Sequence, residues 1–185
     1  MPINNLTLPI ETARLILRDF VEADFAAVHA YASDDEVTQF MFYPPRSESD
    51  TRNYLRRMIQ SQSETPRTIW EMAIIRKTDK RLIGACDLTI ERNGDGDLGY
   101  ILSRQTWGQG YASEVAKALV EVGFTELNLN RIYAICDVNN YASIRVLEKA
   151  GLRRETLLEN YKEAKGRWWN VYFYALSRND WLTQK

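Results

Sequence analysis

The segment QTWGQGYASEVAKALVEVGF, from Gln105 to Phe124, carries the most information about the fold. Two glycines, Gly108 and Gly110, stand one residue apart immediately before a strongly periodic apolar pattern. The pattern has the period of an α-helix, and its apolar face consists of Ala112, Val115, Ala116, Leu119, Val120, Gly123 and Leu127. The sequence therefore predicts a helix that is preceded by unusually flexible backbone.

Two interpretations of these glycines are open. The first turn of a helix has unpaired N–H groups and a partial positive charge, so it suits a phosphate that approaches bare backbone. A tight turn without a ligand needs the same glycines. Two nucleotide motifs do not fit: Tyr111 and Ala112 follow Gly110 where a P-loop needs Lys-Ser/Thr, and Ser113 replaces the third glycine of a dinucleotide fingerprint.

The segments on either side of this helix predict strands. Upstream, the apolar period is two in Thr68–Arg76, Arg81–Glu91 and Gly96–Ser103, and short turns join them into an antiparallel meander. Downstream, Arg131–Val138 is an apolar, β-branched segment of strand length. A strand on each side of a helix makes a crossover unit with parallel strands. The fold class is therefore α+β, with a mixed, mostly antiparallel sheet.

The outer segments extend this pattern. Arg14–Phe20 alternates as a half-buried strand, and a later helix follows a loop, with Ser49 or Asp50 as its expected N-cap. Near the C-terminus, Asn139 or Asn140 is expected to cap a short helix that ends at Gly151, and the tail reads as a hairpin with its turn at Lys165-Gly166.

Composition and charge limit the classes of function and partner that we expect. The 185 residues are 45% hydrophobic and 26% charged, which is ordinary for one globular domain, and we expect residues 1–185 to form one. The formal charge of −1 and the absence of a basic block argue against nucleic acid. No signal peptide and no apolar run of about 20 residues is visible, so we expect a cytoplasmic protein with no membrane partner. Cys86 and Cys136 lie in apolar segments without metal-ligand spacing, which predicts buried thiols and no metal site.

Several segments, in order, resemble one family. QTWGQG matches Gln/Arg-x-x-Gly-x-Gly/Ala, the acetyl-CoA pyrophosphate motif of the GNAT superfamily of N-acetyltransferases. The surroundings resemble its RimJ/RimL-like branch of ribosomal-protein N-acetyltransferases, from Glu11 to Leu176. The resembling segments are ETARLILRDF, SDDEVTQFM, DLGYIL, NNYASIRVLEKAGL and GRWWNVYFYAL. Two positions depart from the pattern: Leu152 replaces the usual phenylalanine, and Asn170 replaces a common aspartate that could ionise.

The resemblance implies a GNAT fold, a seven-stranded mixed sheet that splays open at one parallel junction and is flanked by helices. It also implies acetyl-CoA as co-substrate, with pantetheine in the splay and pyrophosphate on the amides of the glycine loop. The implied cofactor-binding residues are Ile101, Leu102, Trp107, Gly108, Gln109, Gly110, Tyr111, Ala112, Asn139, Ser143 and Lys149. Lys149 is equally well explained as a solvated helix lysine.

The same resemblance implies direct transfer of the acetyl group, with no cysteine nucleophile. A backbone N–H of Ile101 or Leu102 is the expected donor to the thioester oxygen, because the splayed strand lacks a partner there. Ser143, in the family's Asn-x-x-Ser motif that begins at Asn140, is the expected acid for the leaving thiolate; a helix-end hydrogen bond explains it equally well. Tyr141 is the alternative acid.

The base that deprotonates the amine is assigned to Asp97, which matches a position where family members carry a glutamate. A solvated strand-end carboxylate is the competing interpretation. Glu71 and Asp87, embedded in apolar strands, rank behind it as candidates for a buried, perturbed carboxylate. His29 is interpreted as a helix-surface residue. The aromatic segments Met41–Pro45 and Arg167–Trp169 either line an acceptor groove or belong to the core.

We therefore expect an acetyl-CoA-dependent N-acetyltransferase that acts on a primary amine, with a protein N-terminal α-amine implied by the resemblance. The alternatives are a small amine (a polyamine, an antibiotic or an amino acid) as acceptor, or a CoA-binding sensor without catalysis. The sequence leaves a monomer and a homodimer equally open.

Overall fold

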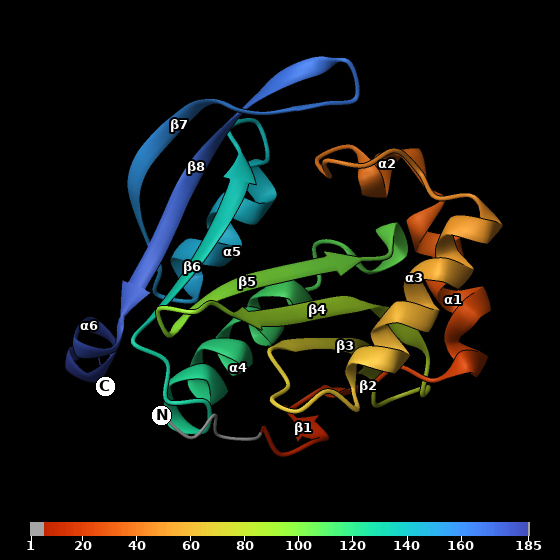
Figure 1. Cartoon of the computed structure of the whole chain (residues 1–185), viewed down its shortest axis with the longest axis horizontal. Coiled ribbons are helices and arrows are strands. Elements are labelled where there is room, and N and C mark those ends of the chain that lie inside the picture. The colour runs from red at the N-terminus through yellow and green to blue at the C-terminus, as the bar shows by residue number, and fades with distance from the viewer. Residues whose placement is uncertain (1–5, 185) are drawn as a thin grey trace.

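The structure is a computed structural model that describes residues 6–184, a mixed sheet with helices on both faces (Figure 1). The start of the N-terminal segment, in which we expect no signal peptide, lies outside the described residues. The strands are β1 (Ile10–Glu11), β2 (Leu15–Asp19), β3 (Ile69–Arg76), β4 (Leu82–Ile90), β5 (Asp95–Leu102), β6 (Arg131–Asp137), β7 (Arg153–Ala164) and β8 (Arg167–Ser177). The α-helices are α1 (Phe25–Ala32), α2 (Asp35–Thr38), α3 (Glu48–Ser61), α4 (Tyr111–Thr125), α5 (Tyr141–Lys149) and α6 (Arg178–Thr183), with 3-10 turns η1 (Glu22–Asp24) and η2 (Arg104–Thr106).

The sheet has the order β1-β2-β3-β4-β5-β6-β8-β7. Every neighbouring pair is antiparallel except β5 and β6, so the predicted α+β class and its single parallel junction are confirmed. The described sheet has eight strands and not the expected seven. The extra strand is β1, whose two residues pair with Leu17 and Ile16 of β2 and are too few to show an alternating pattern.

The parallel junction splays open. β5 and β6 pair only where Asp95–Asp97 meets Arg131–Tyr133, whereas β4 follows β5 along its whole length and β8 follows β6. Figure 1 shows β6 turning away from β5 toward the β7–β8 hairpin. The second half of β5 therefore has one neighbouring strand instead of two.

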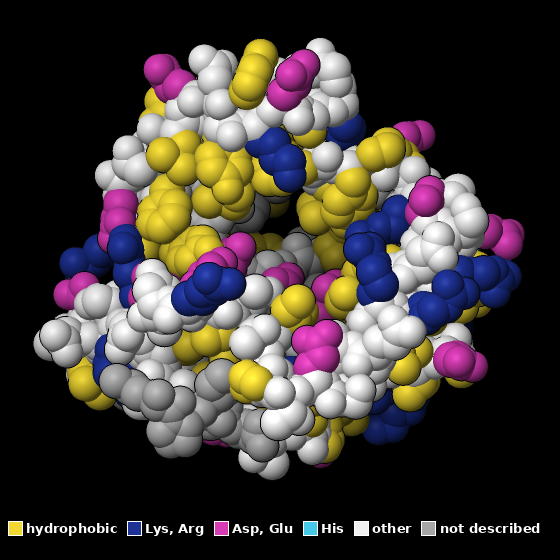
Figure 2. Space-filling view, in the orientation of Figure 1, with side chains coloured by type: hydrophobic (Ala, Val, Ile, Leu, Met, Phe, Trp, Pro, Cys, Tyr) yellow, Lys and Arg dark blue, Asp and Glu magenta, His cyan; other side chains and the backbone are white. Residues whose placement is uncertain are grey.

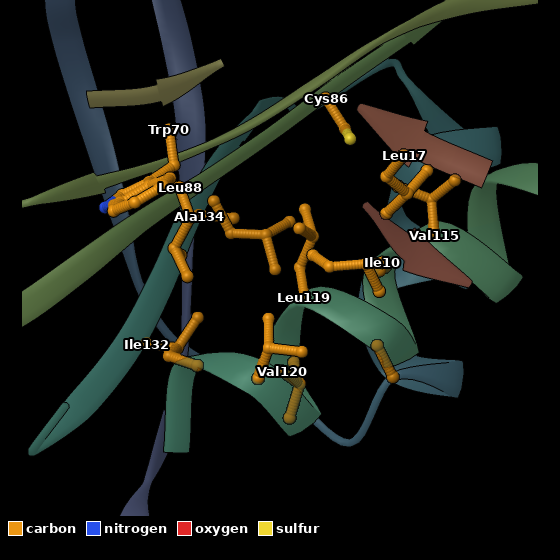
Figure 3. Close-up of a cluster of buried hydrophobic side chains, with 14 of the residues drawn as sticks. Ile10, Leu17, Trp70, Cys86, Leu88, Val115, Leu119, Val120, Ile132 and Ala134 are labelled. Carbon is orange, nitrogen blue, oxygen red and sulfur yellow. The ribbon is translucent and has the colours of Figure 1, made fainter. Parts of the chain in front are cut away.

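The two faces of the sheet carry separate cores. On one face α4 packs against the strands: Val115 lies beside Leu17 of β2, and Leu119 and Val120 share the same buried cluster with Leu88 and Ile132 (Figure 3). On the other face, α1 and α3 cover β2 to β4; this second core consists of Phe20, Val28, Tyr31, Ala32, Val37, Tyr54, Leu55, Ala73, Ile75 and Ala85. Residues two apart in a strand share a face, so Glu71, Asp87 and Asp97 lie on the same side as Ala73 and Ala85.

Local signals explain where the helices begin. α3 begins after Ser47, not after Ser49 or Asp50: the Ser47 hydroxyl accepts from the amide of Asp50, whose carboxylate accepts from the amide of Ser47. Asn140, one of the two expected caps, accepts from the amide of Ser143 at the start of α5. The hairpin turns at Lys165-Gly166 as predicted, where both residues have positive φ.

Candidate active site

The glycine loop between η2 and α4 presents bare backbone. Gly108 and Gly110 have φ of +75° and +79°, conformations that favour glycine, and a Cβ on Gly108 would meet no atom within 4 Å. The helix's first internal hydrogen bond runs from the amide of Glu114 to the carbonyl of Gly110. The amides of Tyr111, Ala112 and Ser113 therefore have no acceptor within the helix. The open loop and these amides fit a pyrophosphate.

The side chains of Arg14 and Trp107 fix the position of this loop. Arg14, which precedes β2, donates to the carbonyl of Gln109 at 2.9 Å, pairs with Glu114 at 2.6 Å and lies over the Tyr111 ring. The indole N–H of Trp107 donates to the carbonyl of Leu102 at 2.9 Å. The loop is thus tied to both β2 and the end of β5. The sequence alone does not identify Arg14, because nothing in its local pattern indicates a partner 95 residues away.

The backbone of β5 determines which amides face the splay. The amide of Ser103 donates to the Ile83 carbonyl of β4, and the Asp95 carbonyl accepts from Glu91, so odd-numbered residues of β5 point their N–H and C=O groups toward β4. The amide of Ile101 is therefore paired with β4, and its assignment as thioester donor is wrong. The amides of Tyr100 and Leu102 face the splay instead.

A pocket of about 450 Å³ opens beside this backbone. In Figure 2 the face is visibly hollowed, with hydrophobic side chains around the opening and acidic groups at its floor. Its lining includes Tyr100 and Ile101 of β5, Ser143 of α5, and the carboxylates of Glu71, Asp87 and Asp97. The acetyl-transfer and acceptor candidates of the sequence thus come together in one cavity.

The three carboxylates form a row across the sheet, which we call the acid row. Glu71 of β3 is directly opposite Asp87 of β4, and Asp87 is opposite Gly99 of β5, next to which Asp97 lies on the same face. A Cβ on Gly99 would lie 2.2 Å from an oxygen of Asp87, so the carboxylate lies across the strand only because this residue is glycine. At the far end, the hydroxyl of Tyr54 donates to Glu71.

The pKa values fall along the acid row toward the splay. Burial, with the charge of Asp87 beside it, raises the pKa of Glu71 to about 8. Burial and then Asp97 raise the pKa of Asp87 to about 7, and burial with Glu91 raises that of Asp97 to about 6. Near neutral pH Asp97 is therefore mostly ionised and able to accept a proton, whereas Glu71 is mostly protonated.

Ser143 lies against Tyr100, a residue to which no sequence motif assigns a role. The hydroxyl of Tyr100 is 2.8 Å from the Ser143 hydroxyl, and it also donates to the Ser143 carbonyl at 3.3 Å. Burial raises the pKa of Tyr100, so its phenol keeps its proton. The two protonated hydroxyls, at the N-terminal turn of α5, are a proton source next to the splay. The one feature of the sequence that pointed to Tyr100 was its position within the family-like segment DLGYIL.

Other predicted residues lie away from the pocket. Tyr141 is 66% exposed and does not line the cavity, and Asn140 rather than Asn139 contributes to its wall. Lys149 is exposed at the C-terminal end of α5. His29 pairs with Thr51 and joins α1 to α3, more buried than a surface residue but remote from the site.

The aromatic segments divide between the two expected roles. Met41, Phe42 and Tyr43 line the pocket. Trp169 is fully buried and packs edge-on against Phe42, with ring centroids 5.3 Å apart, whereas Trp168 is 57% exposed. The first segment therefore belongs to the groove, and the second supports it from the hairpin.

Within residues 6–184, no group of histidine, cysteine or acidic side chains has the arrangement of a metal site, and Cys86 and Cys136 are buried free thiols. The helices of this same part of the chain are too short or too polar to cross a bilayer.

The arrangement agrees with known proteins. The family model for the acetyltransferase (GNAT) domain matches residues 14–153. The chain belongs to this family. It is 36% identical to an N-acetyltransferase called p20 from Bacillus licheniformis, over 92% of this chain and 96% of that protein. It is also similar to the crystal structure of a GNAT acetyltransferase from Bacillus anthracis, with a TM-score of 0.83 and 30% identity over 93% of this chain and 99% of the other.

More distant structures share the fold alone. One is the spermidine N-acetyltransferase from Vibrio cholerae in complex with CoA and spermine, with a TM-score of 0.79 and 21% identity over 92% of this chain and 99% of the other. Another is the ribosomal-protein-S5-alanine acetyltransferase from Vibrio fischeri, with a TM-score of 0.80 and 20% identity over 95% and 99%. The GNAT protein described here is an acetyl-CoA-dependent N-acetyltransferase, and acetyl-CoA, its co-substrate, supplies an acetyl thioester.

Proposed function

We propose that this GNAT protein acetylates the α-amine of a peptide or protein N-terminus, as enzymes of the RimJ/RimL type do. The supporting observation is the pKa of about 6 at Asp97, the carboxylate nearest the splay. An α-amine has a pKa of about 8, so passing its proton to Asp97 costs about 3 kcal/mol; a lysine amine near 10.4 costs about 6 kcal/mol. The site is therefore matched to the more acidic amine.

The proposed roles follow from position. Asp97 takes the proton from the acceptor amine, directly or through one water. The amides of Tyr100 and Leu102 donate to the oxygen on which negative charge develops. Ser143, backed by the Tyr100 hydroxyl at 2.8 Å, delivers a proton to the departing sulfur. Each role uses a group that lines or borders the same cavity.

Cofactor binding is proposed for the glycine loop. Its residues are Trp107, Gly108, Gln109, Gly110, Tyr111 and Ala112. The left-handed glycines and the unpaired first-turn amides support this assignment, because they present donors and a helix N-terminus to an anion. For the whole of residues 1–185 we propose one N-acetyltransferase domain. β8, which lies beyond the match to the family model, is inserted between β6 and β7 and completes the same sheet.

A polyamine is the second candidate acceptor, because the acid row lines the pocket and its Asp97, which is mostly ionised near neutral pH, attracts ammonium groups. Spermidine acetylation is the activity of one structural neighbour.

The test is a competition with acetyl-CoA among a peptide with a free N-terminus, the same peptide with a blocked N-terminus and one lysine, and spermidine. Mass spectrometry locates the acetyl group. We expect it on the α-amine. Acetyl found mainly on the lysine, or only on spermidine, would show that the α-amine assignment is wrong.

A further inference from the structure

A cation lies at the end of the pocket remote from the splay. Arg46 follows the aromatic segment that lines the cavity, and its guanidinium lies 3.9 Å from the centroid of the Tyr54 ring and 4.5 Å from that of Tyr43. Arg46 also lines the pocket itself. Two aromatic faces thus hold a guanidinium in place while its N–H groups remain free to donate.

Arg46 has no ion-pair partner among the described residues. Arg167 and Lys165, two other cations near the cavity, are engaged: Arg167 pairs with Asp137 at 3.4 Å, and Lys165 donates to the carbonyls of Thr38 and Gln39. A third, Lys162, lines the pocket but is exposed and lies over the Phe42 ring, so it is less fixed than Arg46. An arginine that is fixed in a pocket wall and left unpaired is typical of a site for a carboxylate or phosphate.

The charge of Arg46 acts on Glu71, the nearest end of the acid row, and lowers its pKa, but burial and Asp87 outweigh this effect, so Glu71 offsets only part of the Arg46 charge. Glu71 receives its hydrogen bond from Tyr54, and its pKa of about 8 keeps it mostly protonated near neutral pH. In the same wall, the buried hydroxyl of Tyr31 has no hydrogen-bond partner among the described residues, which is unusual for a buried donor. The pocket is therefore acidic near the splay and donor-rich at the opposite end.

We infer that the acceptor is a peptide that carries a carboxylate in addition to its reacting amine, and that Arg46 binds this carboxylate. This inference rests on the proposed α-amine function and names its substrate class. A peptide seated in this way places its amine at Asp97 and its anionic group at Arg46. A polyamine places a second cation there and is repelled.

The spacing of the sheet sets the length of the acceptor. Glu71 and Asp97 lie two strand spacings apart across the sheet and two residues apart along the strand direction, which is roughly 12 Å. In a free amino acid only one carbon separates the amine from the carboxylate, which is too short for this span. An extended chain advances about 3.5 Å per residue. An acidic side chain at the second or third residue, or the C-terminal carboxylate of a short peptide, therefore fits.

The experiment compares acetylation of Ala-Ala-Glu-Ala-amide and Ala-Ala-Gln-Ala-amide by initial rates of thiol release. Ala-Ala with a free carboxylate and free alanine test the other sources of the anion. We expect kcat/KM about 10-fold higher for the Glu peptide, mostly through KM, since its carboxylate gains a charge-assisted hydrogen bond that the neutral amide of the Gln peptide does not. Arg46→Gln should bring the Glu peptide down to the rate of the Gln peptide, and Arg46→Lys should restore part of the preference.

Two controls keep the result interpretable. Lys162→Gln removes an exposed cation that also lines the pocket, near Phe42, and should leave the preference intact. Because a folding defect in an Arg46 variant lowers both peptide rates equally, the ratio between them reports recognition alone.

Equal wild-type rates for the two peptides, or a preference that survives Arg46→Gln, would overturn the inference while leaving the α-amine function standing. Acetylation of free alanine at the rate of the Glu peptide would also overturn it. Acetylation of spermidine and of neither peptide would overturn both proposals.

Discussion

Replacing Asp87 with asparagine should stabilise the fold increasingly as the pH rises. The folded protein holds a proton on Asp87 up to a pKa of about 7, against 3.8 for an ordinary aspartate, because burial and the charge of Asp97 disfavour ionisation. A carboxyl with a raised folded pKa contributes stability that is fully present below the unfolded pKa and is lost as pH rises through the folded pKa. The window of loss is therefore about pH 4 to 7.

The magnitude follows from the shift. About 3 pKa units at 1.36 kcal/mol each give an upper bound of about 4 kcal/mol of unfolding free energy, of which about 3 kcal/mol is lost between pH 5 and 8. Asparagine does not titrate and escapes this loss. Its presence also removes the charge that raises the pKa of Glu71, which acts in the same direction. The stability of Asp87→Asn relative to wild type should thus rise by about 3 kcal/mol from pH 5 to 8.

Urea unfolding followed by tryptophan fluorescence at pH 5, 6, 7 and 8 measures this difference. Glu64→Gln, at an exposed carboxylate in the turn after α3, is the matched control and should follow the wild-type pH dependence. A difference between Asp87→Asn and wild type that stays constant with pH would show that Asp87 ionises as freely in the folded protein as in the unfolded chain, and the reasoning on the acid row would be wrong.

Other variants test cofactor binding and catalysis. Gly110→Val should weaken CoA binding at least about 10-fold by calorimetry, because a side chain at φ +79° distorts the loop that faces the anion; Gly166→Val, also at positive φ but in the hairpin turn, bears similar strain and should bind CoA normally. Unchanged affinity in Gly110→Val would remove the loop from the site. Ser143→Ala should lower kcat by roughly 10- to 1000-fold with little change in CoA affinity, and Asp97→Asn should abolish the rise of kcat/KM with pH near 6. Wild-type turnover in Ser143→Ala would make its hydroxyl structural, and an unchanged pH profile in Asp97→Asn would exclude it as the base.

Sequence predicted best what local periodicity encodes. The helical pattern after Gly110, the strands on both sides of it and the cap at Asn140 are all confirmed, because each rests on residues adjacent in the chain. Of the two amides expected as donor, Ile101 and Leu102, the sequence could not exclude Ile101, because the direction of a backbone amide depends on strand register, which the hydrogen bond from Ser103 to Ile83 reveals. The alternation of apolar residues predicts that Glu71 lies in a strand, but it does not predict which residue of the neighbouring strand lies opposite Glu71.

Two arginines outside the helices and strands gave no signal in the sequence. Arg46 lies in a loop, and only the packing of Tyr43 and Tyr54 around it reveals its orientation. Arg14 contacts the glycine loop across the fold, which no local pattern indicates. Such residues are positioned by tertiary contacts, so a single sequence does not identify them.

The splay between β5 and β6 leaves unpaired strand backbone inside a sheet rather than at its rim. Unpaired edges invite pairing with strands of other molecules, which leads to aggregation. Here β6 and the hairpin that continues the sheet flank the opening, so the unpaired backbone lies within the sheet and not at its rim. A slender, flexible chain such as pantetheine is narrower than a polypeptide strand with side chains. We infer that the fold reserves this unpaired backbone for the co-substrate, inside the sheet and away from the rim where strands of other molecules pair.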